Sequence, residues 1–204
     1  MPKIDVKCLP VGEFRENCYL VVNAETRECL IVDPGEEGER IIRAAQAYRP
    51  AAVLLTHAHW DHIGAVDAVC GYFGIPLYVH EADAPKLTDS VKNVARQFGY
   101  DVTVSTRPLM LRGGETLSLA GMDIRVLHTP GHSAGSVCYL LPGAQGVLTG
   151  DTLFAHGYGR TDFADGSFHE LKESLRALFH LTPRQIAYPG HEEAGTVGRD
   201  PVEG

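Results

Sequence analysis

Four short apolar stretches of this chain are each followed, within three residues, by a histidine or an aspartate. The stretches cover residues 53–56, 124–127, 147–149 and 186–188, and the polar residues that follow lie within 57–62, 128–132, 150–151 and 189–191. Short continuous apolar runs are typical of buried strands, and functional sites of α/β proteins assemble at strand ends. We therefore expect a fold in which these four strand ends meet at one edge.

The rest of the chain alternates strand-like and helical patterns without a linker. Ser167 followed by Glu170 forms a capping box that predicts a helix ending near residue 179. The mixed order predicts sheets inside and helices outside, and it does not fit a simple doubly wound parallel sheet. Further helices are predicted at 39–48, 63–73 and 88–98, and strands at 4–9, 18–22, 29–32, 51–56, 76–79, 115–119, 122–127, 137–141, 147–149 and 185–188.

The composition predicts one globular domain over residues 1–204. Hydrophobic residues make up 44% of the chain, which is enough for a core without staples. The 18 Lys and Arg residues against 26 Asp and Glu residues give a net charge of −8, so no basic footprint is available for nucleic acid or a membrane surface. Because no apolar run approaches the roughly 20 residues that span a bilayer, and residues 1–7 lack a signal core, we expect a soluble, cytoplasmic protein.

The cysteines give no sign of a thiolate site. There are five of them, an odd number, and no two form a CxxC pair. All have apolar neighbours, which is typical of free, buried thiols with packing roles. They lie at positions 8, 18, 29, 70 and 138.

His57, His59, Asp61 and His62 form the densest polar cluster of the sequence. Two histidines spaced two residues apart at the end of an extended strand point their imidazoles the same way. Asp61 and His62 then turn into the next helix and can face a neighbouring ion. Imidazole and carboxylate ligands suit zinc, manganese or iron, and the absence of thiolate argues against a structural zinc finger.

Of the other histidines, His80, His156, His169 and His180 are isolated. His128 lies four residues before His132 and is expected to be a packed or loop residue, with a ligand or supporting role left open. His169 and His180 fit the exposed surface of a helix, and His156 falls in a loop.

The order and spacing of these residues resemble the metallo-β-lactamase superfamily, and in particular its short bacterial branch of glyoxalase II-like thioester hydrolases. The resemblance covers nearly the whole chain. It implies a single-domain αββα sandwich with the site at one edge of the sheets. The motifs that carry it are ENCYL at 16–20, DPG at 33–35, THAHWDHIG at 56–64, TPGHSAGS at 129–136, TGDTLF at 149–154, GRTDF at 159–163 and PGHE at 189–192.

The resemblance implies seven ligands for two divalent metal ions, with zinc preferred and iron or manganese as the other options. Nitrogen and oxygen donors with open positions match a catalytic site. The first ion is assigned to His57, His59 and His132, the second to Asp61, His62 and His191, and Asp151 is assigned as the bridge.

The activity that the resemblance implies is hydrolysis of a small-molecule thioester such as S-D-lactoylglutathione to a hydroxy acid and a free thiol. Asp61 and Asp151 are the expected catalytic carboxylates, because they hold the two metals between which the attacking hydroxide is bound. A thiol has a pKa of about 8.5, so a thiolate leaves without a dedicated general acid. The acyl group, the thiol carrier and the oligomeric state stay open.

Arg160 and Trp60 are the predicted substrate contacts. A guanidinium can bind a substrate carboxylate through two hydrogen bonds, and an indole beside the ligands can wall the pocket. The alternatives are a structural Arg160–Asp162 pair and a packing role for Trp60. Two positions depart from the larger glyoxalase II enzymes, since Glu193 replaces an aromatic residue and Asp162 replaces a tyrosine.

Two other activities on the same fold compete with thioester hydrolysis. Residues 159–163 also resemble the persulfide dioxygenases, which hold one iron in a facial triad; here the triad would be His57, His132 and Asp151. β-Lactam hydrolysis is less favoured, because several true lactamases have a cysteine ligand at the place of Asp151. The number and kind of bound metals discriminate between the first two activities.

Overall fold

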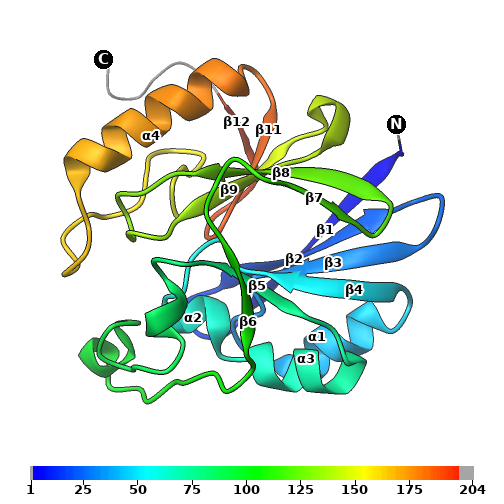
Figure 1. The fold of residues 1–204 in the computed structure, drawn as a ribbon, viewed down its shortest axis with the longest axis horizontal. Coiled ribbons are helices and arrows are strands. Elements are labelled where there is room, and N and C mark those ends of the chain that lie inside the picture. Colours follow the sequence, from blue (N-terminus) through cyan, green and yellow to red (C-terminus); the bar gives the residue numbers. More distant parts are fainter. Residues whose placement is uncertain (1, 198–204) are drawn as a thin grey trace.

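The computed structural model describes residues 2–197, which form two six-stranded sheets packed face to face (Figure 1). Each sheet is built from consecutive strands of one half of the chain. The first sheet contains β1 (Ile4–Val11), β2 (Glu16–Asn23), β3 (Glu28–Val32), β4 (Arg49–Leu54), β5 (Leu77–His80) and β6 (Pro108–Leu111). The second contains β7 (Thr116–Leu119), β8 (Met122–His128), β9 (Val137–Leu140), β10 (Val147–Gly150), β11 (Ile186–Pro189) and β12 (Gly195–Thr196).

Helices cover the outer face of each sheet, so the layers follow the predicted αββα order (Figure 1). The first sheet carries α1 (Gly38–Ala45), α2 (Trp60–Ile63) and α3 (Val66–Phe73), and the second carries α4 (Phe168–Leu181). Three short 3₁₀ helices, Ala84–Lys86, Ala95–Phe98 and Pro142–Ala144, lie in the connections. Within residues 2–197, no helix is long and apolar enough to cross a bilayer.

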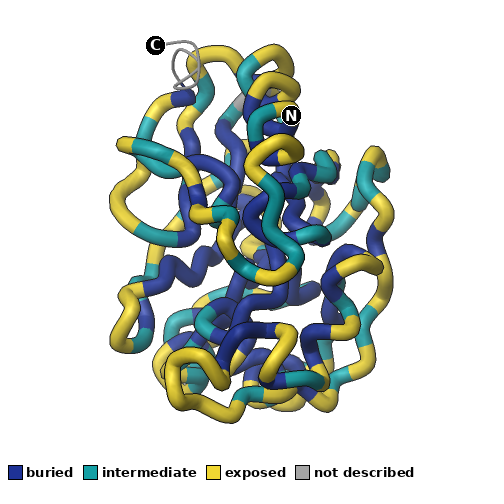
Figure 2. The backbone as a smooth tube through the Cα atoms, turned by 90° about the vertical axis from the view of Figure 1, so that its left-hand side faces the viewer, coloured by how far each residue is buried: buried dark blue, intermediate teal, exposed yellow. Residues whose placement is uncertain are grey.

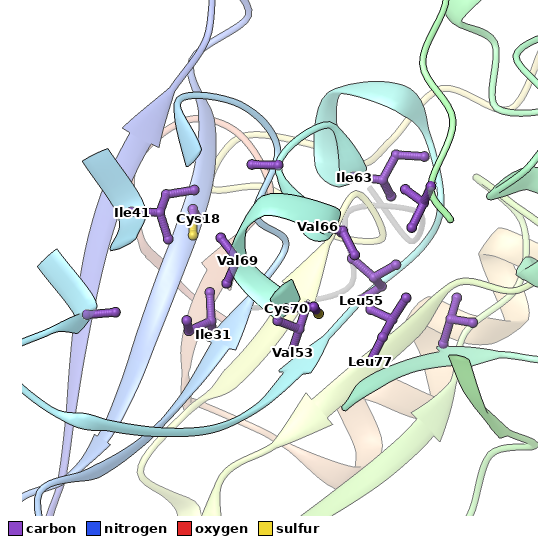
Figure 3. Packing of buried hydrophobic residues seen from close by; sticks show 14 of the residues in the cluster. Cys18, Ile31, Ile41, Val53, Leu55, Ile63, Val66, Val69, Cys70 and Leu77 are labelled. Atoms are coloured by element: carbon purple, nitrogen blue, oxygen red, sulfur yellow. The ribbon is translucent and has the colours of Figure 1, made fainter. Parts of the chain in front are cut away.

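Each layer boundary holds its own hydrophobic core. Figure 3 shows the core between the first sheet and its helices, where Ile41 and Val69 pack against strand residues such as Ile31. A second core lies between the sheets, and a third lies under α4 around Leu175. Every residue of β2 is buried, because both faces of that strand are covered. The backbone accordingly passes through a buried centre with exposed outer loops (Figure 2).

Parallel pairing brings the strand ends that matter to one edge. β3 pairs in parallel with β4, and β10 pairs in parallel with β11. The carboxyl ends of parallel neighbours lie on the same side of a sheet. Hydrogen bonds between the sheets lie beside that edge: among them, the Val137 amide donates to the Thr56 carbonyl at 2.8 Å, and the Tyr139 hydroxyl donates to the Leu55 carbonyl at 2.6 Å.

The helix predicted at 88–98 is wrong. Only the 3₁₀ turn Ala95–Phe98 forms there, and Val94 has a left-handed φ of 62°. The Asp89 carboxylate accepts hydrogen bonds from the amides of Val91 and Lys92, and the Asn93 side chain accepts from the Ala95 amide. Such local side-chain bonds compete with the helical ones and favour turns.

Three smaller expectations also need correction. The helix predicted at 63–73 forms as α3 but begins only at Val66, because Ile63 ends α2 and the Ala65 amide donates to the Pro34 carbonyl at 2.9 Å. The edge strands β6 and β12 were not predicted. Cys8 is exposed, whereas the other four cysteines are buried, because Cys8 lies on β1, the edge strand of the first sheet.

Replacing Ser167 with alanine is expected to lower the free energy of unfolding by about 1 kcal/mol. The Ser167 hydroxyl caps α4 by accepting a hydrogen bond from the Glu170 amide at 3.3 Å. Urea denaturation would measure the loss. Ser167→Asp preserves a capping acceptor and is the control, and an equal loss in both variants would show that the cap contributes nothing.

Candidate metal centre

The predicted ligands converge at the edge where the two sheets meet. His57 and His59 lie in the segment between β4 and α2, and Asp61 and His62 lie on α2 itself. The remaining ligands follow strands of the second sheet: His132 lies between β8 and β9, Asp151 follows β10, and His191 follows β11.

Three imidazoles form the first group. His57, His59 and His132 each present one ring nitrogen within 4.8 Å of the other two. The rings meet edge to face, with centroids 4.7–4.9 Å apart. The closest nitrogens, His59 Nδ1 and His132 Nε2, are 2.9 Å apart. Three converging imidazoles on buried residues are the donor set of a zinc-type site.

Asp61, His62 and His191 form the second group, again with ligand atoms within 4.8 Å of one another. Asp61 Oδ2 lies 3.3 Å from His191 Nε2 and 3.9 Å from His62 Nε2. Asn17 holds the His191 loop in place, since its side-chain amide donates to the carbonyls of Pro189 and Glu192 at 3.1 and 2.7 Å.

Asp151 lies between the two groups. Its Oδ1 is 3.5 Å from His62 Nε2, and its Oδ2 is 3.5 Å from His132 Nε2 and 3.7 Å from His191 Nε2. One carboxylate therefore faces imidazoles of both groups, as a ligand shared by two ions must.

The unsatisfied atoms of the cluster fit metal ligation. His57 Nε2, His62 Nε2 and Asp151 Oδ1 are buried and have no hydrogen-bond partner among the described residues. Buried polar atoms are rarely left without a partner, and a missing ion is one physical reason for such exceptions. The nitrogen and oxygen donors suit a divalent ion such as zinc or iron.

Protonation differs across the cluster. Burial, together with the neighbouring imidazoles, lowers the pKa of His57 and of His59 well below its usual value. Both rings are then neutral at pH 7 and offer a lone pair to a cation. Burial alone would also lower the pKa of His62, but the surrounding carboxylates, with Asp61 and Asp151 contributing most, together outweigh it and raise that pKa well above its usual value. A cation bound beside His62 would replace the proton that these carboxylates otherwise attract.

A pocket of about 340 Å³ opens over the ligands. Both Trp60 and Arg160 line it. Trp60 is only 3% exposed and stacks on Tyr100, with ring centroids 4.3 Å apart, so it both packs and walls the pocket. The Arg160 guanidinium makes two 2.6 Å hydrogen bonds to Asp162 and lies 4.6 Å from the centroid of the Phe163 ring.

The pair that the sequence left as an alternative role for Arg160 is therefore formed. The backbone of Arg160 has a separate task, because its carbonyl oxygen lies 2.8 Å from His132 Nδ1 and accepts the ring proton. That contact orients the opposite nitrogen, Nε2, toward His59 and Asp151.

A family model of the metallo-β-lactamase superfamily matches residues 11–191 of this chain. The chain belongs to this superfamily. Among its relatives, the probable metallo-hydrolase YqgX of Bacillus subtilis is 37% identical over 187 residues, which are 90% of this chain and 88% of YqgX. The hydroxyacylglutathione hydrolase GloC of Haemophilus influenzae is 32% identical over 202 residues, which are 97% of this chain and 95% of GloC.

Solved structures of the superfamily share the fold. BLEG-1, a B3 metallo-β-lactamase, superposes with a TM-score of 0.90 and 35% identity over 95% of this chain and 94% of BLEG-1. TTHA1623 in a di-iron-bound form superposes with a TM-score of 0.82 and 35% identity over 94% of both chains. ETHE1 from Myxococcus xanthus superposes with a TM-score of 0.75 and 28% identity over 95% of this chain and 80% of ETHE1. The protein is thus a metallo-hydrolase of the metallo-β-lactamase fold.

Two aspartates that support this superfamily site were not singled out as site residues from sequence. Asp33, directly after β3, accepts hydrogen bonds from the Thr56 amide and hydroxyl at 2.7 and 2.6 Å and lies 3.1 Å from His62 Nδ1. Its position in a Pro-Gly turn after a strand was the available signal.

Asp83 is the second. It is fully buried and accepts from the Ala58 amide at 2.7 Å, the Gly135 amide at 2.8 Å and the Ser133 hydroxyl. Lys86 Nζ lies 3.2 Å from it. Asp83 thereby links the His57–His59 segment to the His132 loop. No short-range sequence pattern indicates this role of Asp83.

Two glycines let the backbone come close to Asp151. A Cβ on Gly190 would lie 2.2 Å from Asp151 Oδ1, and a Cβ on Gly159 would lie 2.0 Å from the Asp151 carbonyl oxygen. A side chain at either position would displace the carboxylate that faces both groups of ligands.

Proposed function

We propose that the protein is a metal-dependent thioester hydrolase that cleaves S-D-lactoylglutathione or a similar acyl-glutathione to an acid and free glutathione. The observation that carries this proposal is the position of Asp151 within 3.7 Å of imidazoles from both ligand groups. Such an arrangement suits two ions, which His57, His59 and His132 on one side and Asp61, His62 and His191 on the other would hold. The identity of the relative GloC as a hydroxyacylglutathione hydrolase supports the choice of substrate.

Two divalent ions at this site would supply a hydroxide at neutral pH and a Lewis acid for the thioester carbonyl. Asp61 and Asp151 contribute the negative charge that holds those cations and fixes the position of the attacking oxygen. Asp33 orients His62 from behind, and the Arg160 carbonyl orients His132. Trp60 and Phe163 line the pocket beside these ligands.

In the reaction, the oxygen of water forms a bond to the acyl carbon and the carbon–sulfur bond breaks. The electron pair leaves with sulfur as a thiolate, the acid carries the new oxygen as a carboxylate, and the protons of the water pass to the solvent. Because the thiol has a pKa of about 8.5, the leaving group needs no protonation by the protein.

The first test is thiol release from S-D-lactoylglutathione with purified protein before and after chelation. Release that a chelator abolishes and zinc or manganese restores is the expected result. A fully metallated sample that releases no thiol would contradict the proposal.

Persulfide dioxygenation is the second candidate, supported by the GRTDF motif at 159–163 and compatible with the structural similarity to ETHE1. It requires one iron on His57, His132 and Asp151, with open positions for oxygen and the persulfide. Oxygen uptake with glutathione persulfide, together with one iron per chain, would favour it over the hydrolase.

Replacing Arg160 with alanine is expected to raise KM roughly tenfold for a thioester with an anionic acyl part and to change KM less for one with a neutral acyl part, since Arg160 lines the pocket beside the ligands and a charge-assisted hydrogen bond is lost. Asp162→Ala is expected to act in the opposite direction, because it frees the guanidinium from the two bonds that now occupy it. Steady-state kinetics with both substrates measure the effects. Equal changes for anionic and neutral thioesters would mean that the Arg160–Asp162 pair only shapes the loop.

A further inference from the structure

The pocket over the metal ligands has aromatic walls. Five aromatic rings besides the imidazoles line it together with ligand side chains. Phe163 packs against the candidate ligands, with its centroid 4.9 Å from that of His59. The five aromatic lining residues are Phe14, Trp60, Phe98, Phe154 and Phe163.

Two of these rings are exposed to solvent. Phe14 is 42% exposed and Phe98 is 40% exposed, and their centroids are 5.6 Å apart. The ring centroids of Phe14 and Trp60 are 5.3 Å apart, so the rings of Phe14, Phe98 and Trp60 are in contact with one another. Clustered apolar groups that stay exposed beside a site mark a surface that a ligand covers.

Polar groups that could recognise a small hydroxyacyl substituent are scarce in this pocket. Apart from the candidate metal ligands, residues 2–197 contribute two side-chain hydrogen-bonding groups to the lining, the Trp60 indole N–H and the Arg160 guanidinium. The Nε and Nη2 atoms of Arg160 already bind Asp162. A hydroxyl group placed against the aromatic walls would lose its bonds to water without a replacement, which is unfavourable.

A second, larger cavity of about 780 Å³ adjoins the first and shares Phe14 and His191 with it. Its lining includes the polar residues Arg15, Asn17 and Glu193. Asp61 and Asp151 line the aromatic pocket and not this cavity. The carbonyl under attack therefore belongs on the aromatic side, and a charged thiol carrier fits the polar side.

We propose that the aromatic pocket holds the acyl part of the thioester and selects apolar, aromatic acyl groups over small hydroxyacyl groups such as lactoyl. This inference rests on the proposed thioester hydrolysis and narrows its substrate class. The polar cavity then holds the thiol carrier, and the scissile carbon–sulfur bond lies where the two cavities meet.

Trp60 allows a binding test that does not depend on turnover. It is the single tryptophan of the chain, so its fluorescence reports on this pocket. Zinc-loaded protein is titrated with phenylacetate and with lactate, two carboxylates that differ in the part that would contact the rings. We expect a Kd for phenylacetate at least about tenfold lower, as an added apolar group typically gives in such a pocket. Equal Kd values for the two acids would overturn the inference.

Phe98→Ala is the decisive variant, because Phe98 is exposed enough to be replaced without opening the core. It is expected to abolish most of the preference for phenylacetate. Tyr72→Ala is the matched control, since Tyr72 is an exposed aromatic residue on α3 outside the pocket lining, and it should leave the preference intact. A preference that survives Phe98→Ala, or that falls equally in both variants, would overturn the assignment.

Thiol release separates this inference from the activity on which it rests. S-phenylacetylglutathione is expected to have a kcat/KM about tenfold or more above that of S-D-lactoylglutathione. If both are hydrolysed and the lactoyl substrate is preferred, the aromatic acyl assignment alone is overturned. If metallated protein hydrolyses neither, thioester hydrolysis itself is overturned together with the assignment.

Discussion

Replacing Asp151 with alanine is expected to remove both metal binding and turnover. Its two oxygens face His62 on one side and His132 and His191 on the other, all within 3.7 Å. Loss of a group that only supports a ligand already costs about 10–100-fold in metal affinity or activity, so loss of the shared carboxylate should cost more than about 100-fold. Metal content after dialysis against a fixed free-zinc buffer, measured with thiol release, checks both effects.

Asp123→Ala is the matched control for that experiment. Asp123 is an exposed aspartate on β8 and contributes nothing to the ligand cluster. It should keep the metal content and rate of the unaltered protein. If the Asp151 variant behaves like this control, the site does not hold two ions through one carboxylate.

Asp83→Ala is expected to cause the largest loss of stability, about 3–5 kcal/mol. The substitution leaves the amides of Ala58 and Gly135 without their acceptor and removes one of the carboxylates beside Lys86, which is 5% exposed. A buried ammonium that loses a counter-charge is costly, and so are buried donors without acceptors. Urea denaturation gives the change in the free energy of unfolding.

Asp67→Ala offers a close comparison. Asp67 also accepts bonds from two amides and two hydroxyls, those of Ser105 and Thr106, but it is partly exposed and has no ion-pair partner within residues 2–197. Water replaces these bonds, so a loss of only about 1–2 kcal/mol is expected. If both variants lose the same free energy of unfolding, burial of the Asp83–Lys86 pair does not increase the cost of removing its carboxylate. Removing the ammonium as well, in Asp83→Ala/Lys86→Met, should recover part of the stability.

The sequence could predict the elements whose signals are local. Short apolar runs ending in histidine or aspartate marked β4, β8, β10 and β11, and the capping box at Ser167 marked the start of α4. The layered order of sheets and helices followed from those elements and from the resemblance. The convergence of the ligands depended on strand ends meeting at one edge, which parallel pairing brings about.

Features that depend on distant partners could not be predicted in this way. Asp33 accepts a hydrogen bond from Thr56, and Asp83 accepts hydrogen bonds from Ala58 and Ser133. These partners are up to 50 positions away in the sequence. The segment 88–98 has helical periodicity, but Asn93 and its neighbours use their side chains to form turns. β6 is an edge strand with two exposed central residues, so its pattern lacks the apolar alternation that marks a half-buried strand.

The division of the chain into one sheet per half has a thermodynamic consequence. His57, His59, Asp61 and His62 belong to the first half, whereas His132, Asp151 and His191 belong to the second. An ion bound by ligands from both halves acts as a reversible cross-link between them, so the free metal concentration becomes a variable of folding. At a free concentration 100 times the Kd, one such ion adds about 2.7 kcal/mol to the free energy of unfolding. Starvation for metal would then reduce the amount of folded protein as well as its activity.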